Sequence, residues 1–92
     1  MKSAKKRGKL EVIHDILEIV KDNNNSIKFT PLLRRSNLSS ERFQEYYSEL
    51  QSRGFVRELS EKNGKIVTLT DNGFRYLERY KTIISFIDDF GL

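Results

Sequence analysis

A β-hairpin in the second half of the chain limits the possible folds most strongly. Two runs rich in β-branched and aromatic residues, Phe55–Leu59 and Ile66–Leu69, flank a short segment that contains Asn63-Gly64. Asn-Gly is the strongest short-range signal for a hairpin, because both positions tolerate the positive φ of a type I′ turn. The sequence therefore predicts two antiparallel strands with Asn63-Gly64 as the turn.

Helical patterns surround this hairpin, three before it and one after it. We predict helices over four segments: residues 10–22, 31–35, 40–53 and 71–90. In the first of these, apolar residues recur at three- and four-residue spacing, as in an amphipathic helix. Thr30, Ser39 and Thr70 are expected to cap the following helices, and Gly54 to end the third. Ser26–Phe29 is predicted to be a brief extended segment.

The last predicted helix carries more apolar residues than one side of a small domain can cover. Plotted at 100° per residue, these side chains occupy well over half of the circumference. Part of the set, at positions 77, 80, 84 and 87, follows the 3-4-3 spacing of a coiled-coil seam. We therefore predict a homodimer, and the alternative is a monomer whose first helix covers both sides. The expected interface residues are Leu77, Tyr80, Ile83, Ile84, Ile87 and Phe90.

Basic residues are concentrated at the N-terminus. The chain of 92 residues has a net charge of +4. Residues 1–9 contain five Lys or Arg and no acid, so the rest of the chain carries a net −1. Arms of this kind often contact phosphates of nucleic acids, and the alternative is a solubilising tail.

The composition argues against enzymes, cofactors and membranes. There is no cysteine and only one histidine, His14, so the chain lacks the residues for a disulfide, a thiolate zinc site or a Cys-His pair. No Gly-x-Ser-x-Gly elbow or phosphate-binding glycine loop is present. No apolar run approaches the ~20 residues that span a bilayer, and no secretory signal is evident. We expect a cytoplasmic, non-enzymatic protein without a cofactor, a small-molecule substrate or a membrane partner.

Two groups on the first predicted helix resemble ligand sets but have simpler explanations. Four acids, Glu11, Asp15, Glu18 and Asp22, share its outer face, and a solvated stripe is expected there rather than a metal site. His14 lies at the margin of the apolar arc, where we expect a partly packed side chain rather than a ligand.

The order helix, short extended segment, helix, helix, hairpin, helix is that of a winged helix-turn-helix, an α+β, mainly α, fold. Specific motifs match this order: Leu38-Ser39 with Phe43, Tyr46-Tyr47 and Leu50; Gly54-Phe55-Val56; and Leu69-Thr70-x-x-Gly73 with Tyr76-Leu77. Together with a basic arm leading into LEVIHDILEIV, they make the chain resemble the small archaeal winged-helix DNA-binding proteins over nearly its whole length.

The resemblance implies a DNA-binding homodimer, a transcriptional regulator or a nucleoid-associated chromatin protein, whose C-terminal helices form an antiparallel coiled coil. It suggests three parts: a basic arm over residues 1–9, a DNA-binding domain over 10–69 and a dimerisation helix over 70–92. The third helix would enter the major groove, and the hairpin and arm would contact phosphates. With Asn63-Gly64 as the turn, Lys62 and Lys65 would face each other at the tip.

The residues expected to contact DNA come from the arm, the second and third helices and the hairpin. They are Lys5, Lys6, Arg7, Arg34, Arg35, Ser39, Ser40, Arg42, Gln44, Lys62, Asn63 and Lys65. Glutamates on the third helix would repel phosphates, so binding should depend on backbone contacts and show modest or no sequence preference. The competing hypothesis is a winged-helix protein-interaction module that does not bind DNA.

Overall fold

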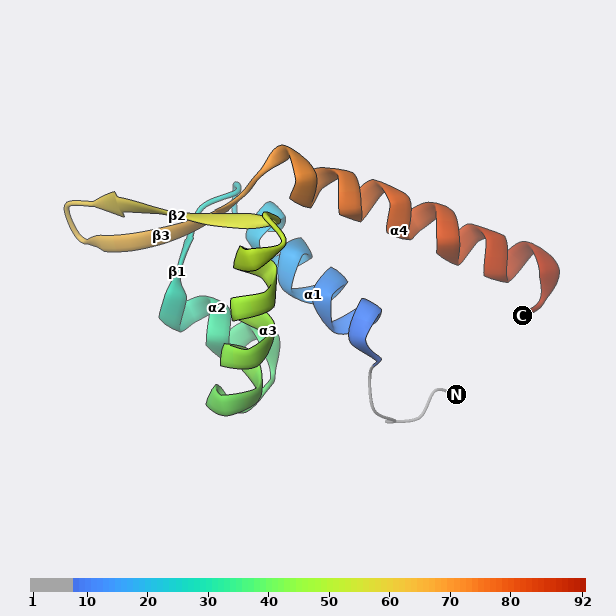
Figure 1. Cartoon of the computed structure of the whole chain (residues 1–92), viewed down its shortest axis with the longest axis horizontal. Helices are drawn as coiled ribbons and strands as arrows, with labels where there is room; N and C mark the ends of the chain where they lie inside the picture. Colours follow the sequence, from blue (N-terminus) through green and yellow to red (C-terminus); the bar gives the residue numbers. More distant parts are fainter. Residues whose placement is uncertain (1–7) are drawn as a thin grey trace.

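The computed structural model describes residues 8–92 and contains four helices and three strands (Figure 1). Along the chain these are α1 (Lys9–Asp22), β1 (Ile27–Lys28), α2 (Phe29–Ser36), α3 (Ser40–Ser52), β2 (Val56–Glu61), β3 (Gly64–Leu69) and α4 (Asp71–Phe90). The expected α+β, mainly helical order is therefore confirmed. The basic arm with Lys5, Lys6 and Arg7 lies outside the described residues.

The core lies between the helices and one face of the sheet. Helix α1 crosses the centre of the core. Its apolar residues are spread widely enough around the helix to contact α2, β3 and α4. Five of its side chains are buried: Val12, Ile13, Ile16, Leu17 and Val20. Leu32 from α2 and Phe43 from α3 complete the buried centre. The predicted amphipathic helix 10–22 is thus confirmed as the main element of the core.

The sheet has three antiparallel strands in the order β1-β3-β2, one more than the sequence predicts. The short strand β1 pairs with β3, with Ile27 opposite Val67 and Lys28 opposite Ile66. The sequence indicates the extended segment but not its partner, because a two-residue strand gains its hydrogen bonds only when a distant strand lies beside it.

The turn of the β2–β3 hairpin differs from the prediction by one residue. Glu61 pairs with Gly64, so Lys62 and Asn63 form the turn, and Lys65 lies opposite Ser60 rather than Lys62. The physical reason is the backbone conformation. Among these residues only Gly64 has a positive φ, +114°, whereas a type I′ turn at Asn63-Gly64 would also require one at Asn63.

Two of the three expected helix caps are present. The Ser39 side chain accepts a hydrogen bond from the Arg42 amide (3.2 Å), and Thr70 accepts one from the Gly73 amide (3.1 Å). The prediction for Thr30 is wrong, because α2 begins at Phe29, directly after β1, and has no side-chain cap. Pro31 then lies in the first turn of α2, where backbone amides lack helical partners anyway.

The start of α4 is fixed closely against the domain. A Cβ atom on Gly73 would collide with the backbone carbonyl of Phe55, and that carbonyl also accepts a hydrogen bond from the Thr70 amide (3.1 Å). One turn later Leu77 is only 5% exposed and belongs to the core. Leu77 must therefore be removed from the expected dimer interface, because the chain's own core already covers it.

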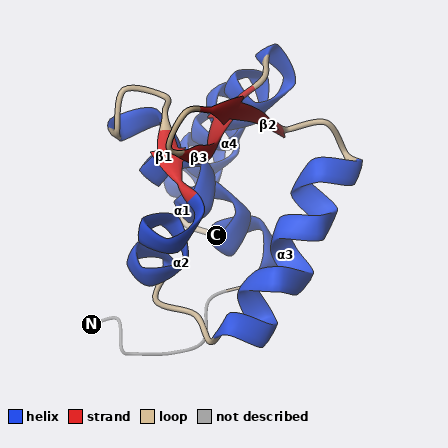
Figure 2. Ribbon diagram, turned by 90° about the vertical axis from the view of Figure 1, so that its left-hand side faces the viewer, coloured by secondary structure: helices blue, strands red, loops and turns tan. Residues whose placement is uncertain are grey.

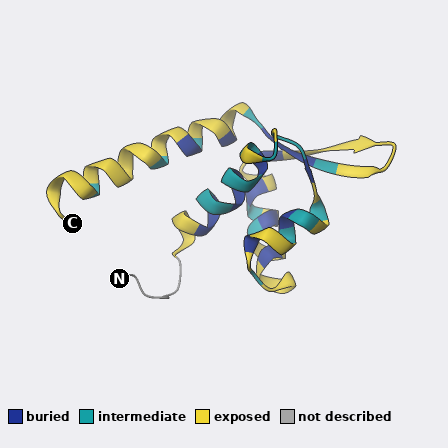
Figure 3. Cartoon of the chain, turned by 180° about the vertical axis from the view of Figure 1, so that it is seen from behind, coloured by how far each residue is buried: buried dark blue, intermediate teal, exposed yellow. Residues whose placement is uncertain are grey.

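The rest of α4 extends away from the domain (Figures 1 and 3). Beyond Tyr80 its residues are exposed apart from the partly covered Ile87. None of the helices among residues 8–92 combines the length and the apolar character needed to cross a bilayer.

Candidate nucleic-acid interface

Helix α3 packs on the domain with one side and leaves the other to solvent (Figure 2). Phe43, Tyr47 and Leu50 are buried, one helical turn apart. The rings of Phe43 and Tyr47 stack at 5.6 Å, and the ring of Phe29 at the start of α2 meets both edge-on at 5.3 Å. This aromatic cluster sets the rotation of α3 and thereby decides which of its side chains are exposed.

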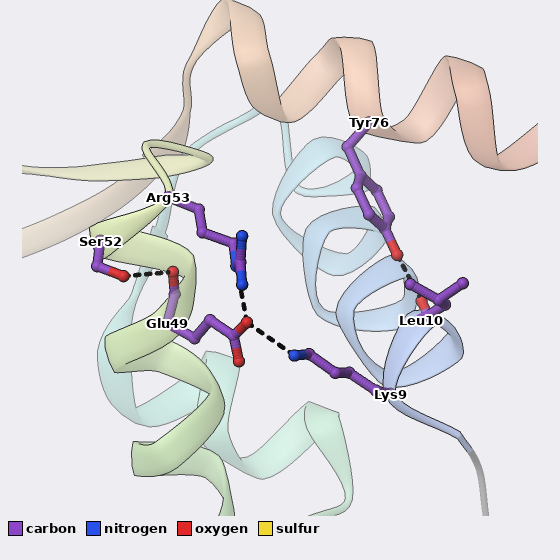
Figure 4. Close-up of polar contacts among 6 residues, drawn as sticks. All are labelled: Lys9, Leu10, Glu49, Ser52, Arg53 and Tyr76. Atoms are coloured by element: carbon purple, nitrogen blue, oxygen red, sulfur yellow. Dashed lines mark hydrogen bonds and ion pairs between the residues drawn. The ribbon is translucent and has the colours of Figure 1, made fainter.

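One flank of α3 faces the start of α1, and its charges are already paired (Figure 4). The Glu49 carboxylate lies 2.9 Å from Lys9 Nζ and 2.7 Å from Arg53 Nε. Hydrogen bonds from Lys9 and Arg53 hold the pKa of Glu49 below its ordinary value. The Arg42 guanidinium lies over the Tyr46 ring, 5.7 Å from its centroid. On this flank, charged groups are thus occupied by neighbours within the chain.

Lys9, Arg42, Glu45, Tyr46 and Glu49 line a shallow hollow of about 200 Å³ between α3 and the start of α1. Arg42, which the sequence analysis places in the DNA contact set, therefore lies on the flank that faces α1.

The opposite flank of α3 faces the hairpin and is lined mainly by uncharged residues, with Glu41 at its outer margin. The Tyr47 hydroxyl donates a 2.7 Å hydrogen bond to Glu58 of β2, so the flank of α3 next to Tyr47 is the one that faces the hairpin. Residues three or four positions apart share a helix face, so Gln44 and Gln51 lie beside Tyr47. We call the four exposed, uncharged residues on this flank the polar strip: Ser40, Gln44, Ser48 and Gln51. Glu41, three residues before Gln44, borders the polar strip on its outer side, whereas Glu45 lines the hollow on the α1 flank.

The hairpin projects beyond α3 and carries basic residues near its tip (Figure 1). Lys62 and Asn63 form the exposed turn, and Lys65 is exposed beside it. Side chains alternate between the two faces of a strand. Lys65 therefore shares the core-side face with Glu58, and their charged groups are 3.8 Å apart. Arg57 lies on the other face.

Lys28 is a basic residue of this region that sequence reasoning missed. Its Nζ donates a 2.8 Å hydrogen bond to the backbone carbonyl of Asn63 at the tip of the hairpin. The pairing of β1 with β3 places it there, and only the β-branched and aromatic character of residues 26–29 hinted at such a strand.

The structure directs Arg35 of α2 towards the end of α1 rather than towards the polar strip. Arg35 Nη1 donates a 3.0 Å hydrogen bond to Asn23 Oδ1 at the end of α1. It lines a hollow of about 310 Å³ together with Asp15, Glu18 and Asp22 of the acidic stripe. Arg34 is exposed at the same end of α2. Because Arg35 is directed towards the end of α1, the basic residues that the structure places near the polar strip are those of the hairpin. Figure 2 shows α2 and α3 joined by a short turn below the sheet.

His14 is packed partly against α4, as its position in the sequence indicates. Its ring stacks on Tyr80 with the centroids 4.2 Å apart, and its nitrogens lie 3.1 Å from Asp15 and 3.2 Å from Glu18. These contacts connect α1 to the third turn of α4.

Solved structures with the same arrangement come from different sources. Sso10a-2, a DNA-binding protein from Sulfolobus solfataricus, has 20% sequence identity and a TM-score of 0.73, with 91% of this chain and 85% of that chain covered. F93 from STIV, a winged-helix DNA-binding protein, has 18% identity and a TM-score of 0.72, with 86% and 91% covered. SSV1 F-93 has 24% identity and a TM-score of 0.66, with 97% and 99% covered. At these identities the likeness is one of fold.

Comparison with protein families gives the assignment. No curated protein sequence matches this chain. Residues 6–88 match the winged helix-turn-helix family. Because this match includes all the helices and strands except the last two residues of α4, and because the fold has the same order of elements, the chain belongs to the winged helix-turn-helix family.

Proposed function

We propose that this protein binds double-stranded DNA as a homodimer, as a transcriptional regulator or chromatin protein. The polar strip of α3 would face the major groove, and the β2–β3 hairpin, the wing of this fold, would contact phosphates beside it. The observation that carries the proposal is the exposed polar strip of α3, which lies beside the body of a projecting hairpin whose tip is basic. Two of the similar structures, Sso10a-2 and F93 from STIV, are themselves described as DNA-binding proteins.

The distribution of charge on α3 is compatible with this orientation. Of the three glutamates on α3, Glu49 is paired with Lys9 and Arg53 on the far flank. Glu41 and Glu45 are exposed, and their charges limit the affinity that α3 itself can supply. Within the polar strip, Gln44 has the side chain that pairs with adenine in the major groove. Affinity would then come chiefly from the wing and from the N-terminal Lys5, Lys6 and Arg7, and sequence preference would be modest.

The exposed apolar face of α4 supports the homodimer. Ile83, Phe86 and Phe90 are 46%, 55% and 66% exposed, which is unusual for large apolar side chains so close together. With Leu77 in the core, the remaining expected interface residues are Tyr80, Ile83, Ile84, Ile87 and Phe90, and four of them, at positions 80, 83, 87 and 90, again follow 3-4-3 spacing. In this proposal residues 70–92 join two subunits whose DNA-binding parts lie within residues 10–69, and the protein acts at the nucleoid.

The proposal is tested by titrating duplex DNA at several salt concentrations. About four phosphate contacts per subunit correspond to a slope of log affinity against log salt of about −7 for the dimer. Replacing both Lys62 and Lys65 by alanine should weaken binding and make the slope for the dimer less steep by about 2 to 4. Lys81→Ala, on the exposed side of α4, is the matched control and should bind like the wild type.

Affinity that is indifferent to salt, or a double wing variant that binds like the wild type, would contradict DNA binding through this surface. The protein-interaction module would then be favoured. Replacing Lys5, Lys6 and Arg7 together by alanine measures the contribution of the N-terminal arm to affinity. Like that of the wing lysines, this contribution should depend on salt and not on DNA sequence.

A further inference from the structure

We propose that Glu58 is a positioning residue that restrains Lys65 and thereby limits how tightly the wing binds DNA. The inference rests on the proposed function, but it concerns a residue on which that proposal does not depend. It assigns to one carboxylate a role in setting the affinity of the wing for any duplex.

The position of Glu58 is unusual for an acid on a DNA-binding wing. Strand alternation places it on the α3 side of the hairpin, the same face as Lys65, where it is the only acid of the described strands β2 and β3. Glu61, three residues further along β2, has its side chain on the opposite face. Phosphates that reach Lys65 must therefore approach the Glu58 carboxylate as well.

A hydrogen bond from the core holds the carboxylate in place. Tyr47 is only 2% exposed, and its hydroxyl donates to Glu58 Oε2 at 2.7 Å. Burial, followed by the hydrogen bond to Glu58, raises the pKa of Tyr47, so the hydroxyl stays a donor at all ordinary pH values. An ordinary surface glutamate can rotate away from an approaching anion. Glu58 cannot do so without leaving a buried hydroxyl unpaired.

The second carboxylate oxygen of Glu58 faces Lys65. The Oε1–Nζ distance of 3.8 Å is that of a loose ion pair, short enough to offset the charge of the lysine and long enough to be broken by a competing phosphate. Lys62 in the turn forms no ion pair within residues 8–92. The two wing lysines should therefore differ, with Lys62 fully available to DNA and Lys65 partly held back.

The direct test is Glu58→Gln. A glutamine keeps an acceptor oxygen for the Tyr47 hydroxyl and removes only the charge. One unit charge removed at about 6 Å from a phosphate in water corresponds to about threefold in affinity, or about tenfold for two subunits. The variant should bind a non-specific duplex tighter by this factor, and its salt slope should be steeper by about one unit per subunit, since Lys65 is released.

Glu61→Gln is the matched control. It makes the same charge change on the same strand but on the opposite face, so its effect on affinity should be less than half as large, and its salt slope should equal that of the wild type. Thermal unfolding of both variants establishes that the fold is retained. Equal effects of Glu58→Gln and Glu61→Gln would overturn the inference.

A double-mutant cycle tests the link to Lys65 independently. In the wild-type background, Lys65→Ala should weaken DNA binding less than Lys62→Ala does. In the Glu58→Gln background, Lys65→Ala should weaken DNA binding at least as much as Lys62→Ala does. Additive effects of Glu58→Gln and Lys65→Ala would overturn the proposed restraint. A wild type that binds no duplex would instead refute the proposed function, and that outcome is seen before any variant is compared.

Discussion

The two halves of α4 contain similar apolar residues but make very different contacts. In the first half, Leu77 is buried, and the Tyr76 hydroxyl donates a 2.8 Å hydrogen bond to the carbonyl of Leu10. In the second half, Ile83, Phe86 and Phe90 are exposed, and Phe86 and Phe90 contact each other at 4.9 Å between centroids. The difference shows that the domain closes its own core near Tyr80. Apolar side chains beyond that point require a second surface.

The largest expected difference between the halves is in folding stability. Leu77→Ala should lower the free energy of unfolding by about 2 to 5 kcal/mol, because it leaves a cavity in the core. Ile83→Ala should change it by less than about 1 kcal/mol when unfolding is measured by urea titration at a protein concentration low enough to give monomers. Similar losses in both variants would show that the second half also packs on its own domain.

Self-association should depend on the second half alone. Ile83→Glu places a charge in the proposed seam and should weaken dimerisation at least about tenfold, measured by sedimentation velocity over a range of concentrations. Thr82→Glu is the matched control, since it introduces the same charge on the adjacent, polar side of α4 and should leave the dimer intact. A wild type that stays monomeric at high concentration would contradict the dimer.

Removing the cap at the start of α4 should have a smaller effect on the free energy of unfolding than removing Leu77. Thr70→Ala removes the acceptor for the Gly73 amide and should cost about 1 kcal/mol in thermal or chemical unfolding. Thr70→Ser keeps the hydroxyl and should therefore retain most of the stability that Thr70→Ala loses. Thr82→Ala, in the exposed half, should fall within about 0.5 kcal/mol of the wild type. If Thr82→Ala cost as much as Thr70→Ala, the contrast between the halves would fail.

A further difference in stability is expected at alkaline pH. Burial, then the neighbouring Tyr80, raises the pKa of Tyr76 to about 12. The unfolded chain loses this proton near the ordinary value of 10, so the stabilisation is complete below pH 10 and is lost as the pH rises from 10 to 12. Tyr76→Phe should make the decline in stability over this range shallower, as followed by urea unfolding at each pH. Parallel curves for wild type and variant would refute this account.

Local physics accounts for what the sequence predicted well. Helix periodicity, the Ser39 and Thr70 caps and the end of α3 before Gly54 depend on residues within one or two turns of each other, and the structure confirms them. The winged order of elements follows from these local features in succession. The assignment of Thr30 as a cap failed because the strand before it, which pairs with β3, moves the start of α2 to Phe29.

The site was predicted less completely, because its geometry depends on packing between distant segments. Lys28 reaches the wing tip only through the pairing of β1 with β3. Arg35 turns towards Asn23 and the acidic stripe of α1, which no local pattern indicates. The rotation of α3, which decides that Gln44 faces the wing and Arg42 faces α1, is set by the aromatic contacts of Phe29, Phe43 and Tyr47.

By itself, the amino-acid sequence determined the kinds of elements, their order and the surplus of apolar residues on α4, since these depend on spacing and local backbone preference. Only the tertiary structure decided the hairpin register, the third strand, the flank of α3 that faces the hairpin and the removal of Leu77 from the exposed seam. The reason is that burial and pairing are properties of segments far apart in the chain, and which side of an amphipathic helix is covered depends on what lies beside it.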